Sequence, residues 1–368
     1  MESIIIRGFV EVVRNLSLGE SWENESRKIY MVTRVAINGF GRIGRNILRA
    51  YTSGSWKEFE IVAINDIADI EMAVFLLSYD SVHGRLEKGV ACTEGTIDVG
   101  FGPILYLSHS DASMIDWKAL GVDLVLECTG RFTDANKAEV HLNSGAKKVL
   151  ISAPSKEAEV TVVYGVNHND ISTEHKIVSN ASCTTNCLAP VAQVLNNLCG
   201  IKQGFMTTIH SYTGDQRLLD ANHSDKYRAR TTGLNIIPST IGAVSAVGHV
   251  LPELIGKLDG IAVRVPTLKV SEIDFVIEPM DIASVEEIRE GFERAALGSH
   301  SGVLAITNEQ LVSSNFNRHP ASSIVQLDQV RVMPTGMTRV FSWYDNEWGF
   351  SNRMLDTAVI MLQDGRPS

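Results

Sequence analysis

The segment Arg34–Asn46 reads RVAINGFGRIGRN, and it joins a short apolar run, a glycine-rich turn and the beginning of a helical pattern. The first five residues predict a buried strand, because Val, Ala and Ile follow one another without polar alternation. Gly39, Gly41 and Gly44 then form a G-x-G-x-x-G turn. After the turn, apolar residues recur at helical spacing as far as Gly54, which we expect to end the helix. This order of strand, glycines and helix predicts the start of an α/β fold.

A second apolar strand, Glu60–Asn65 (EIVAIN), ends at Asp66, about twenty residues beyond Gly44. Glycines in such a turn let the backbone approach a pyrophosphate, and the helix N-terminus attracts its charge. We expect the Asp66 carboxylate to accept hydrogen bonds from the adenosine ribose and to repel a 2′-phosphate. The alternative is that the glycines serve only a tight turn between strand and helix. The combination favours a Rossmann domain that binds NAD.

The alternation of strands and helices continues downstream. We predict strands over Asp123–Glu127 and Lys148–Ser152, with a helix over Asn136–Ser144 between them. Thr129 and Ser152 then fall at the carboxyl ends of strands, where open α/β sheets bind ligands. They are candidate cofactor contacts, although isolated Thr and Ser residues more often serve turns.

Composition restricts the class of protein. A chain of 368 residues suggests two domains, and its net charge of −10 without a dense basic run disfavours a dedicated nucleic-acid surface. Five cysteines in a chain of this length favour a reduced, cytoplasmic compartment. No apolar run has the length of a transmembrane helix, so we expect no membrane partner. Residues 1–30 precede the first strong strand and lack the features of a secretory signal, so we expect an extension outside the core fold.

The segment Ser179–Pro190, SNASCTTNCLAP, predicts a loop that delivers Cys183 to the first turn of a helix. Unpaired N–H groups and the helix dipole at such an end favour a thiolate. The alternative is a small buried cysteine that only packs. Cys187 lies four residues further on, but no cysteine or histidine cluster completes a metal site, so we predict no metal.

Two further residues stand out in the second half of the chain. The predicted strand Gly204–Ile209 leads directly into His210, which makes this histidine a candidate base for Cys183, although most histidines are structural. Arg264 lies within the apolar strand Gly260–Thr267, where a buried charge requires an anion or, alternatively, an ordinary ion pair.

Several long motifs of this chain resemble those of the phosphorylating glyceraldehyde-3-phosphate dehydrogenases, and the similarity extends from Met31 to the C-terminus. The resemblance implies a Rossmann domain over residues 31–182, completed by residues 346–368, and an α+β catalytic domain over residues 183–345 with a mixed or antiparallel sheet. It also implies a homotetramer. The motifs are INGFGRIGR (Ile37–Arg45), YDSVHG (Tyr79–Gly84), TGRF (Thr129–Phe132), ASCTTNCLAP, the His210 segment, VRVPT and WYDNEWG.

The resemblance also implies roles for individual residues. Cys183 is expected to attack the aldehyde of glyceraldehyde 3-phosphate, with His210 as its base, and the hydride then passes to NAD. Inorganic phosphate attacks the resulting thioester and releases 1,3-bisphosphoglycerate. The residues that match cofactor contacts are Gly39, Gly41, Arg42, Ile43, Gly44, Asp66, Thr129, Ser152 and Asn346. Those that match the substrate-phosphate site are Thr213, Asp215 and Arg264, and those that match the inorganic-phosphate site are Ser182 and Thr184.

Three departures from the family pattern keep alternatives open. Ile241 and Ser245 replace a threonine and a lysine that are usual in the family, which puts the use of inorganic phosphate in doubt. The alternative is oxidation of the aldehyde without phosphate, as in erythrose-4-phosphate dehydrogenase. Ala221-Asn222 replaces a leucine–proline pair, so NADP is a possible secondary acceptor. An alternative of another class is an adhesion or binding protein that keeps only the fold.

Overall fold

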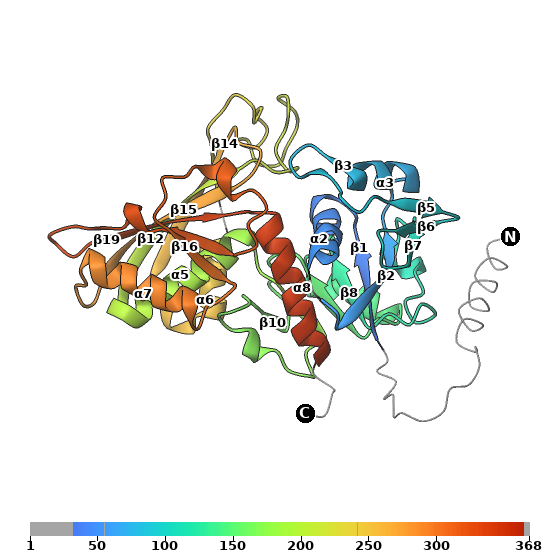
Figure 1. Cartoon of the computed structure of the whole chain (residues 1–368), viewed down its shortest axis with the longest axis horizontal. Helices are drawn as coiled ribbons and strands as arrows, with labels where there is room; N and C mark the ends of the chain where they lie inside the picture. Colours follow the sequence, from blue (N-terminus) through green and yellow to red (C-terminus); the bar gives the residue numbers. More distant parts are fainter. Residues whose placement is uncertain (1–31, 55, 241, 364–368) are drawn as a thin grey trace. The chain divides into compact units, whose positions relative to one another are not determined.

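Two β-sheets, each covered by helices, organise the chain in the computed structural model (Figure 1), which describes residues 32–54, 56–240 and 242–363. From Thr33 on, the chain clusters into one compact unit. The predicted extension over residues 1–30, the Ile241 substitution and residues 364–368 lie outside the described residues.

The first sheet has nine strands in the order β10-β11-β9-β8-β1-β2-β7-β6-β5. Strand β1 pairs in parallel with β2 on one side and with β8 on the other, and the antiparallel pairings of this sheet are those of β6 with β5 and with β7. The predicted parallel sheet is confirmed, with strand ends that differ by about one residue. The strands are β1 (Thr33–Asn38), β2 (Phe59–Asn65), β5 (Ala91–Thr93), β6 (Thr96–Asp98), β7 (Pro103–Leu107), β8 (Leu124–Glu127), β9 (Lys148–Ile151), β10 (Val160–Thr161) and β11 (Ile177–Ser179).

Four helices accompany this sheet, namely α2 (Arg42–Ser53), α3 (Ile70–Ser78), α4 (Ala135–Asn143) and α8 (Trp348–Gln363). Helix α2 begins after Gly41 and ends at Gly54, as the glycine pattern predicts. Helix α8 comes from the end of the chain, yet its apolar face belongs to the same buried cluster as α2 (Figure 1). The core of the first sheet is therefore built from both ends of the described chain.

The second sheet is mixed. Its strands follow the order β13-β14-β12-β15-β19-β17-β16, with β18 paired to β19. Strand β12 runs parallel to β14 and antiparallel to β15. The strands are β12 (Ile201–Ser211), β13 (Ile237–Ser239), β14 (Leu258–Val265), β15 (Ser271–Pro279), β16 (Leu304–Thr307), β17 (Ser323–Gln326), β18 (Arg331–Val332) and β19 (Thr338–Tyr344), and a separate hairpin joins β3 (Tyr79–Asp80) to β4 (Gly84–Arg85).

Three helices, α5 (Cys183–Cys199), α6 (Ala243–Val250) and α7 (Val285–Leu297), pack with the second sheet around the largest buried cluster. Because strand side chains alternate between faces, the inward residues of β12 lie toward this cluster. Side chains on the other face of the sheet point away from the cluster, and among them Phe205 and Ile261 are 45% and 44% exposed. No helix in the described ranges combines the length and apolar character needed to cross a membrane.

Candidate active site

Helix α5 begins at Cys183, and Ser182 is its N-cap. The Ser182 hydroxyl accepts a hydrogen bond from the Thr185 N–H at 3.0 Å, which fixes the first turn of the helix. The Cys183 Sγ lies 3.7 Å from Nε2 of His210. His210 belongs to β12, which continues to Ser211 instead of ending at Ile209 as predicted, because β14 pairs with it along its last residues. The structure thus brings the two predicted reacting residues together.

His210 is 2% exposed, and its ring is neutral. Burial and, to a smaller extent, the nearby Arg264 guanidinium together lower the pKa of His210 to about 3. Its Nδ1 atom lies 2.6 Å from the Ser211 carbonyl oxygen and 2.6 Å from Arg264 Nη1. In one tautomer Nδ1–H donates to Ser211, and in the other Nδ1 accepts from Arg264. The ring can therefore carry its proton on either nitrogen, which suits a group that takes and returns a proton.

The pKa of the Cys183 thiol is shifted in the opposite direction from the one that the sequence predicts. Burial raises the pKa of Cys183, whereas the positive charge of Arg264 and hydrogen bonds in the first helical turn lower it by a smaller amount. The helix start therefore acts in the predicted direction but does not outweigh desolvation. In the protein without ligands, Cys183 and His210 form a neutral thiol–imidazole pair.

Arg264 on β14 faces the reacting pair. Its Nη1 donates to the Ser211 carbonyl at 3.1 Å, and its Nε is buried without a hydrogen-bond partner. Within the described part of the chain, Arg264 forms no ion pair with Asp or Glu, so the ordinary ion-pair alternative does not hold for these residues. A buried guanidinium with an unused N–H is suited to an anionic ligand.

The loop after β12 carries the other substrate-phosphate candidates. Thr213 Oγ1 donates to Gln216 Oε1 at 3.0 Å, and Asp215 Oδ2 accepts from Arg228 Nη1 at 2.8 Å. Arg228 also donates to the Ser239 hydroxyl at 2.9 Å and 2.7 Å, so it holds the loop against β13. Arg228 was not among the predicted site residues, and its only sequence signal is its place in an arginine-containing polar loop.

The two inorganic-phosphate candidates are engaged in structural hydrogen bonds. Ser182 caps α5, and Thr184 is buried with its hydroxyl 2.9 Å from the Tyr344 hydroxyl. Tyr344 also lies 2.9 Å from the Thr208 hydroxyl. Ser245 on α6 donates to the Gly242 carbonyl at 2.9 Å. Tyr344 is thus a neighbour of the site that sequence reasoning missed, because the contact joins residues far apart in the chain.

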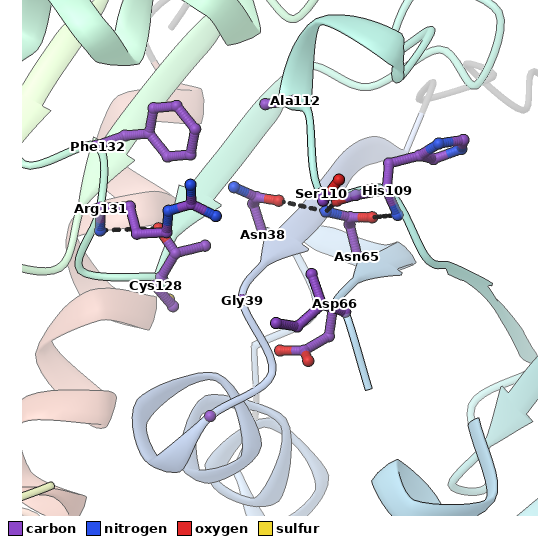
Figure 2. Close-up of a pocket in the computed structure, with 13 residues that line it drawn as sticks. Asn38, Gly39, Asn65, Asp66, His109, Ser110, Ala112, Cys128, Arg131 and Phe132 are labelled. Atoms are coloured by element: carbon purple, nitrogen blue, oxygen red, sulfur yellow. Dashed lines mark hydrogen bonds between the residues drawn. The ribbon is translucent and has the colours of Figure 1, made fainter. Parts of the chain in front are cut away.

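A cavity of about 260 Å³ opens at the carboxyl ends of β1, β2 and β8 (Figure 2). Of the predicted cofactor contacts, Gly39, Gly41, Asp66 and Thr129 line it. Asp66 Oδ2 accepts the Phe40 N–H at 2.5 Å, so the acid also holds the glycine turn. The lining also contains residues that the sequence analysis did not predict as cofactor contacts, namely Asn38, Asn65, Ile67, His109, Ser110, Ala112, Cys128, Arg131 and Phe132.

The glycine turn has the shape that a nucleotide pyrophosphate requires. Gly39 has a φ of +94°, and a Cβ there would lie 2.6 Å from the Thr129 nitrogen. A Cβ on Gly44 would lie 2.1 Å from the Gly39 carbonyl oxygen, whereas Gly41 faces open space. The tight turn and the open position at the start of α2 therefore fit a dinucleotide such as NAD.

Five predicted cofactor contacts do not line this cavity, namely Gly44, which shapes the turn, and Arg42, Ile43, Ser152 and Asn346. Arg42 forms ion pairs with Glu347 and Asp80, and Ile43 packs against the core of the first sheet. Ser152 lies beside the Cys128 thiol. Asn346 is 6% exposed, and its Oδ1 accepts the Ser211 hydroxyl at 2.9 Å, on the side of the reacting pair.

The described residues contain no group of three or more His, Cys, Asp or Glu side chains arranged to hold a metal ion. All five cysteines lie within the described ranges and are free thiols.

Comparison with known families identifies both halves of the chain. Residues 33–135 match the family described as glyceraldehyde 3-phosphate dehydrogenase, NAD binding domain, and residues 182–346 match glyceraldehyde 3-phosphate dehydrogenase, C-terminal domain. The chain is 54% identical over 331 residues to glyceraldehyde-3-phosphate dehydrogenase of Cereibacter sphaeroides, which covers 90% of this chain and 99% of that protein. It is 55% identical to the enzyme of that name from Xanthobacter flavus, with the same coverage.

Proposed function

This chain belongs to the glyceraldehyde-3-phosphate dehydrogenase family and is an NAD-dependent oxidoreductase acting on an aldehyde, and we propose that Cys183 and His210 carry out its chemistry. Its reaction converts glyceraldehyde 3-phosphate and inorganic phosphate into 1,3-bisphosphoglycerate. The observation that supports these roles is the 3.7 Å separation of Cys183 Sγ and His210 Nε2. NAD supplies the hydride acceptor when it is bound.

Because Cys183 and His210 both start neutral, the proton transfers of the reaction occur in a defined order. Nε2 of His210 takes the thiol proton while Cys183 Sγ attacks the aldehyde carbon, and a C–S bond forms. The imidazolium then returns a proton to the developing oxyanion, giving a hemithioacetal hydroxyl. The neutral ring next takes that hydroxyl proton as the hydride leaves carbon, and a thioester remains on Cys183. A phosphate oxygen attacks the thioester carbon and the C–S bond breaks. The leaving thiolate takes back the proton held on His210, the phosphate proton is lost to solvent, and the acyl phosphate departs.

Arg264, Thr213 and Asp215 are the residues that we assign to the phosphate group of the aldehyde substrate. Arg264 supports this assignment through its buried and unpaired Nε, next to His210. Asp215 accepts from Arg228, so we infer that it orients that guanidinium instead of contacting phosphate directly. Ser182 and Thr184 remain our candidates for inorganic phosphate, and each hydroxyl must exchange its present partner to serve there.

The residues that we assign to NAD lie at the glycine turn and near the carboxyl ends of the strands of the first sheet. Gly39, Gly41, Gly44, Asp66 and Thr129 surround or shape the cavity, so we assign them to the adenosine and pyrophosphate of NAD. Arg42 and Ile43 hold the start of α2 through ion pairs and packing, Ser152 lies beside Cys128 of the cavity lining, and Asn346 is assigned to the nicotinamide end. NADP as a secondary acceptor remains a proposal.

We also propose the domain division and the assembly. Residues 31–182 with 346–368 form the NAD-binding domain and residues 183–345 the catalytic domain, which is supported by the shared buried cluster of α2 and α8. A homotetramer is supported by the outer face of the second sheet, where Phe205 and Ile261 are exposed. Five free thiols are consistent with a cytoplasmic protein.

The proposed reaction can be tested by measuring whether NAD reduction requires phosphate. NAD reduction by glyceraldehyde 3-phosphate is expected to require phosphate or arsenate, because the thioester needs that nucleophile for turnover. The same rate without either anion would contradict the proposal and favour hydrolysis. Erythrose 4-phosphate, assayed in parallel, separates the two substrate classes.

A further inference from the structure

The side chain of Asn346 is held in one orientation by donors that all reach the same atom. Its Oδ1 accepts the Ser211 hydroxyl at 2.9 Å, the Val270 N–H at 3.1 Å and the Ser271 hydroxyl at 3.4 Å. Oxygen, and not nitrogen, must occupy this position, because a backbone N–H can only donate. The Asn346 amide nitrogen therefore points away from these donors, with its own N–H groups available to a ligand.

The segment that supplies the backbone donor is strained. Val270 has a φ of +66°, although it is a buried β-branched residue for which this region is unfavourable. Strain of this kind persists where the surrounding structure enforces it, and it gathers at functional sites. Here it accompanies a backbone N–H aimed at Asn346 and a buried side chain on the preceding residue, Lys269.

Lys269 is 5% exposed, and its ammonium lies between the two acidic neighbours of Asn346 in the sequence. Its Nζ is 3.1 Å from Asp345 Oδ2 and 3.7 Å from Glu347 Oε2. It also contacts the ring of His83, with Nζ 2.5 Å from Nε2. Burial lowers the pKa of His83, so the ring is a neutral acceptor for this ammonium.

Both carboxylates have further partners, which makes the arrangement rigid. Glu347 is held by Arg42, through Nε at 2.9 Å and Nη2 at 2.5 Å, and Arg42 also pairs with Asp80. Asp345 accepts the backbone N–H groups of Glu347 at 3.0 Å and Trp348 at 2.7 Å. Lys269 is the group that joins these two anchored carboxylates, one on each side of Asn346.

We propose that Lys269 is a positioning residue, which fixes the Asp345–Glu347 segment so that the Asn346 amide N–H groups face the nicotinamide carboxamide. This rests on the assignment of Asn346 to the nicotinamide end of NAD. The contacts of Lys269 are with Asp345, Glu347 and His83, so it acts on Asn346 through the two carboxylates. The adenosine end of the cofactor is held by other elements, at the cavity beside β1, β2 and β8.

Binding of NAD and of ADP-ribose, measured by calorimetry, separates positioning from general damage, because ADP-ribose lacks the nicotinamide. Lys269→Met is expected to weaken NAD binding by about fivefold to tenfold, the loss of roughly one hydrogen bond, and to leave ADP-ribose binding within about twofold. Asn346→Ala should weaken NAD binding similarly, and the double variant should be no weaker than Asn346→Ala alone. Lys147→Met, at a lysine whose side chain is 74% exposed, is the matched control.

Equal weakening of both ligands, unchanged NAD binding, or additive effects with Asn346→Ala would overturn the role of Lys269. If Lys269→Met does not fold, Lys269→Met with Asp345→Asn removes the two opposite charges together and keeps an acceptor oxygen for the Trp348 N–H. The same comparison of ligands then applies to that variant. Failure of the wild-type protein to bind NAD would instead refute the cofactor assignment.

Discussion

Cys183 Sγ and His210 Nε2 face each other at 3.7 Å, and both groups are neutral in the protein without ligands. Arg264 lowers the pKa of each of them, which favours the thiolate while it disfavours the imidazolium. The proton shared by the pair is therefore bound to the Cys183 sulfur as long as no substrate is present. An anionic substrate group next to Arg264 reduces the effect of that positive charge on His210, which makes the imidazole a stronger base when it is needed.

Replacing the nucleophile tests this arrangement directly. Cys183→Ser is expected to reduce kcat by more than about a thousandfold, since a hydroxyl is a far weaker nucleophile than a thiolate. Cys187→Ser is the matched control, because Cys187 is buried in the same helix and contacts the Ser323 hydroxyl at 3.4 Å. Steady-state rates of NAD reduction should fall for the first variant and stay within a few-fold for the second. Comparable activity of Cys183→Ser would refute the assignment.

The neutral state of His210 has a consequence for acid stability. Its pKa is about 3 in the folded protein and 6.5 for an ordinary histidine, so the unfolded chain binds the extra proton first. The stabilisation is present above about pH 6.5 and is lost as pH falls toward 3, at roughly 1.4 kcal/mol per pH unit. His210→Gln should therefore show a shallower loss of stability across this range in urea unfolding. His249→Gln, at an exposed position, is the control, and parallel curves for wild type and His210→Gln would contradict the prediction.

Glu272 shows the opposite dependence. It is 7% exposed, its Oε2 has no hydrogen-bond partner, and burial, with the nearby Asp274 carboxylate, raises its pKa to about 8. Because the folded pKa lies above the ordinary value of 4.5, its stabilising contribution is present below pH 4.5 and is lost as pH rises through 8. The slope is roughly 1.4 kcal/mol per pH unit.

Glu272→Gln removes this ionisation and keeps the side-chain shape. Its free energy of unfolding should exceed that of the wild type at pH 8, and the difference should shrink toward pH 4.5. Denaturant titrations at several pH values measure it, with Glu139→Gln at an exposed position as the control. A difference that does not vary with pH would show that the variant acts through packing alone.

Asp66 is the residue at which cofactor preference can be tested. Asp66→Asn keeps an acceptor oxygen for the Phe40 N–H, gives up the oxygen that accepts the Ala68 N–H at 2.9 Å, and removes the charge that would repel a 2′-phosphate. We expect the ratio of kcat/KM for NAD to that for NADP to fall by about tenfold, equivalent to ~1.4 kcal/mol. An unchanged ratio would mean that Asp66 acts only by holding the glycine turn.

The sequence was sufficient for the parts of the fold that depend on neighbouring residues. Gly41 and Gly54 delimit α2 as predicted, and Ser284 with Glu287, three residues apart as the S-x-x-E pattern requires, forms a capping box at the start of α7. These features depend on local backbone geometry, which residue type largely determines. The α/β class of the first half followed from the strand–helix alternation and the family resemblance, whereas the order of its strands comes from the structure.

The properties that depend on burial could not be predicted in the same way. The raised pKa of Cys183 follows from packing that no local pattern records. Likewise, Thr184 bonds to Tyr344 and Lys269 lies between Asp345 and Glu347, through contacts between distant parts of the chain. For Arg228, and for Asn38 and Asn65 at the ends of β1 and β2, residue type was the only sign in the sequence of a place at the site.

The path of α8 has a consequence for how the protein is made. On the ribosome, every strand of the first sheet has been synthesised once β11 is complete, but the helix that covers α2 is the last one to emerge. Until then the buried cluster that contains Ile47 and Leu48 lacks Met354 and Leu355 of α8. A nascent chain with exposed apolar surface is a substrate for chaperones and is prone to aggregate. The nucleotide half therefore completes its core only after the catalytic half has been translated.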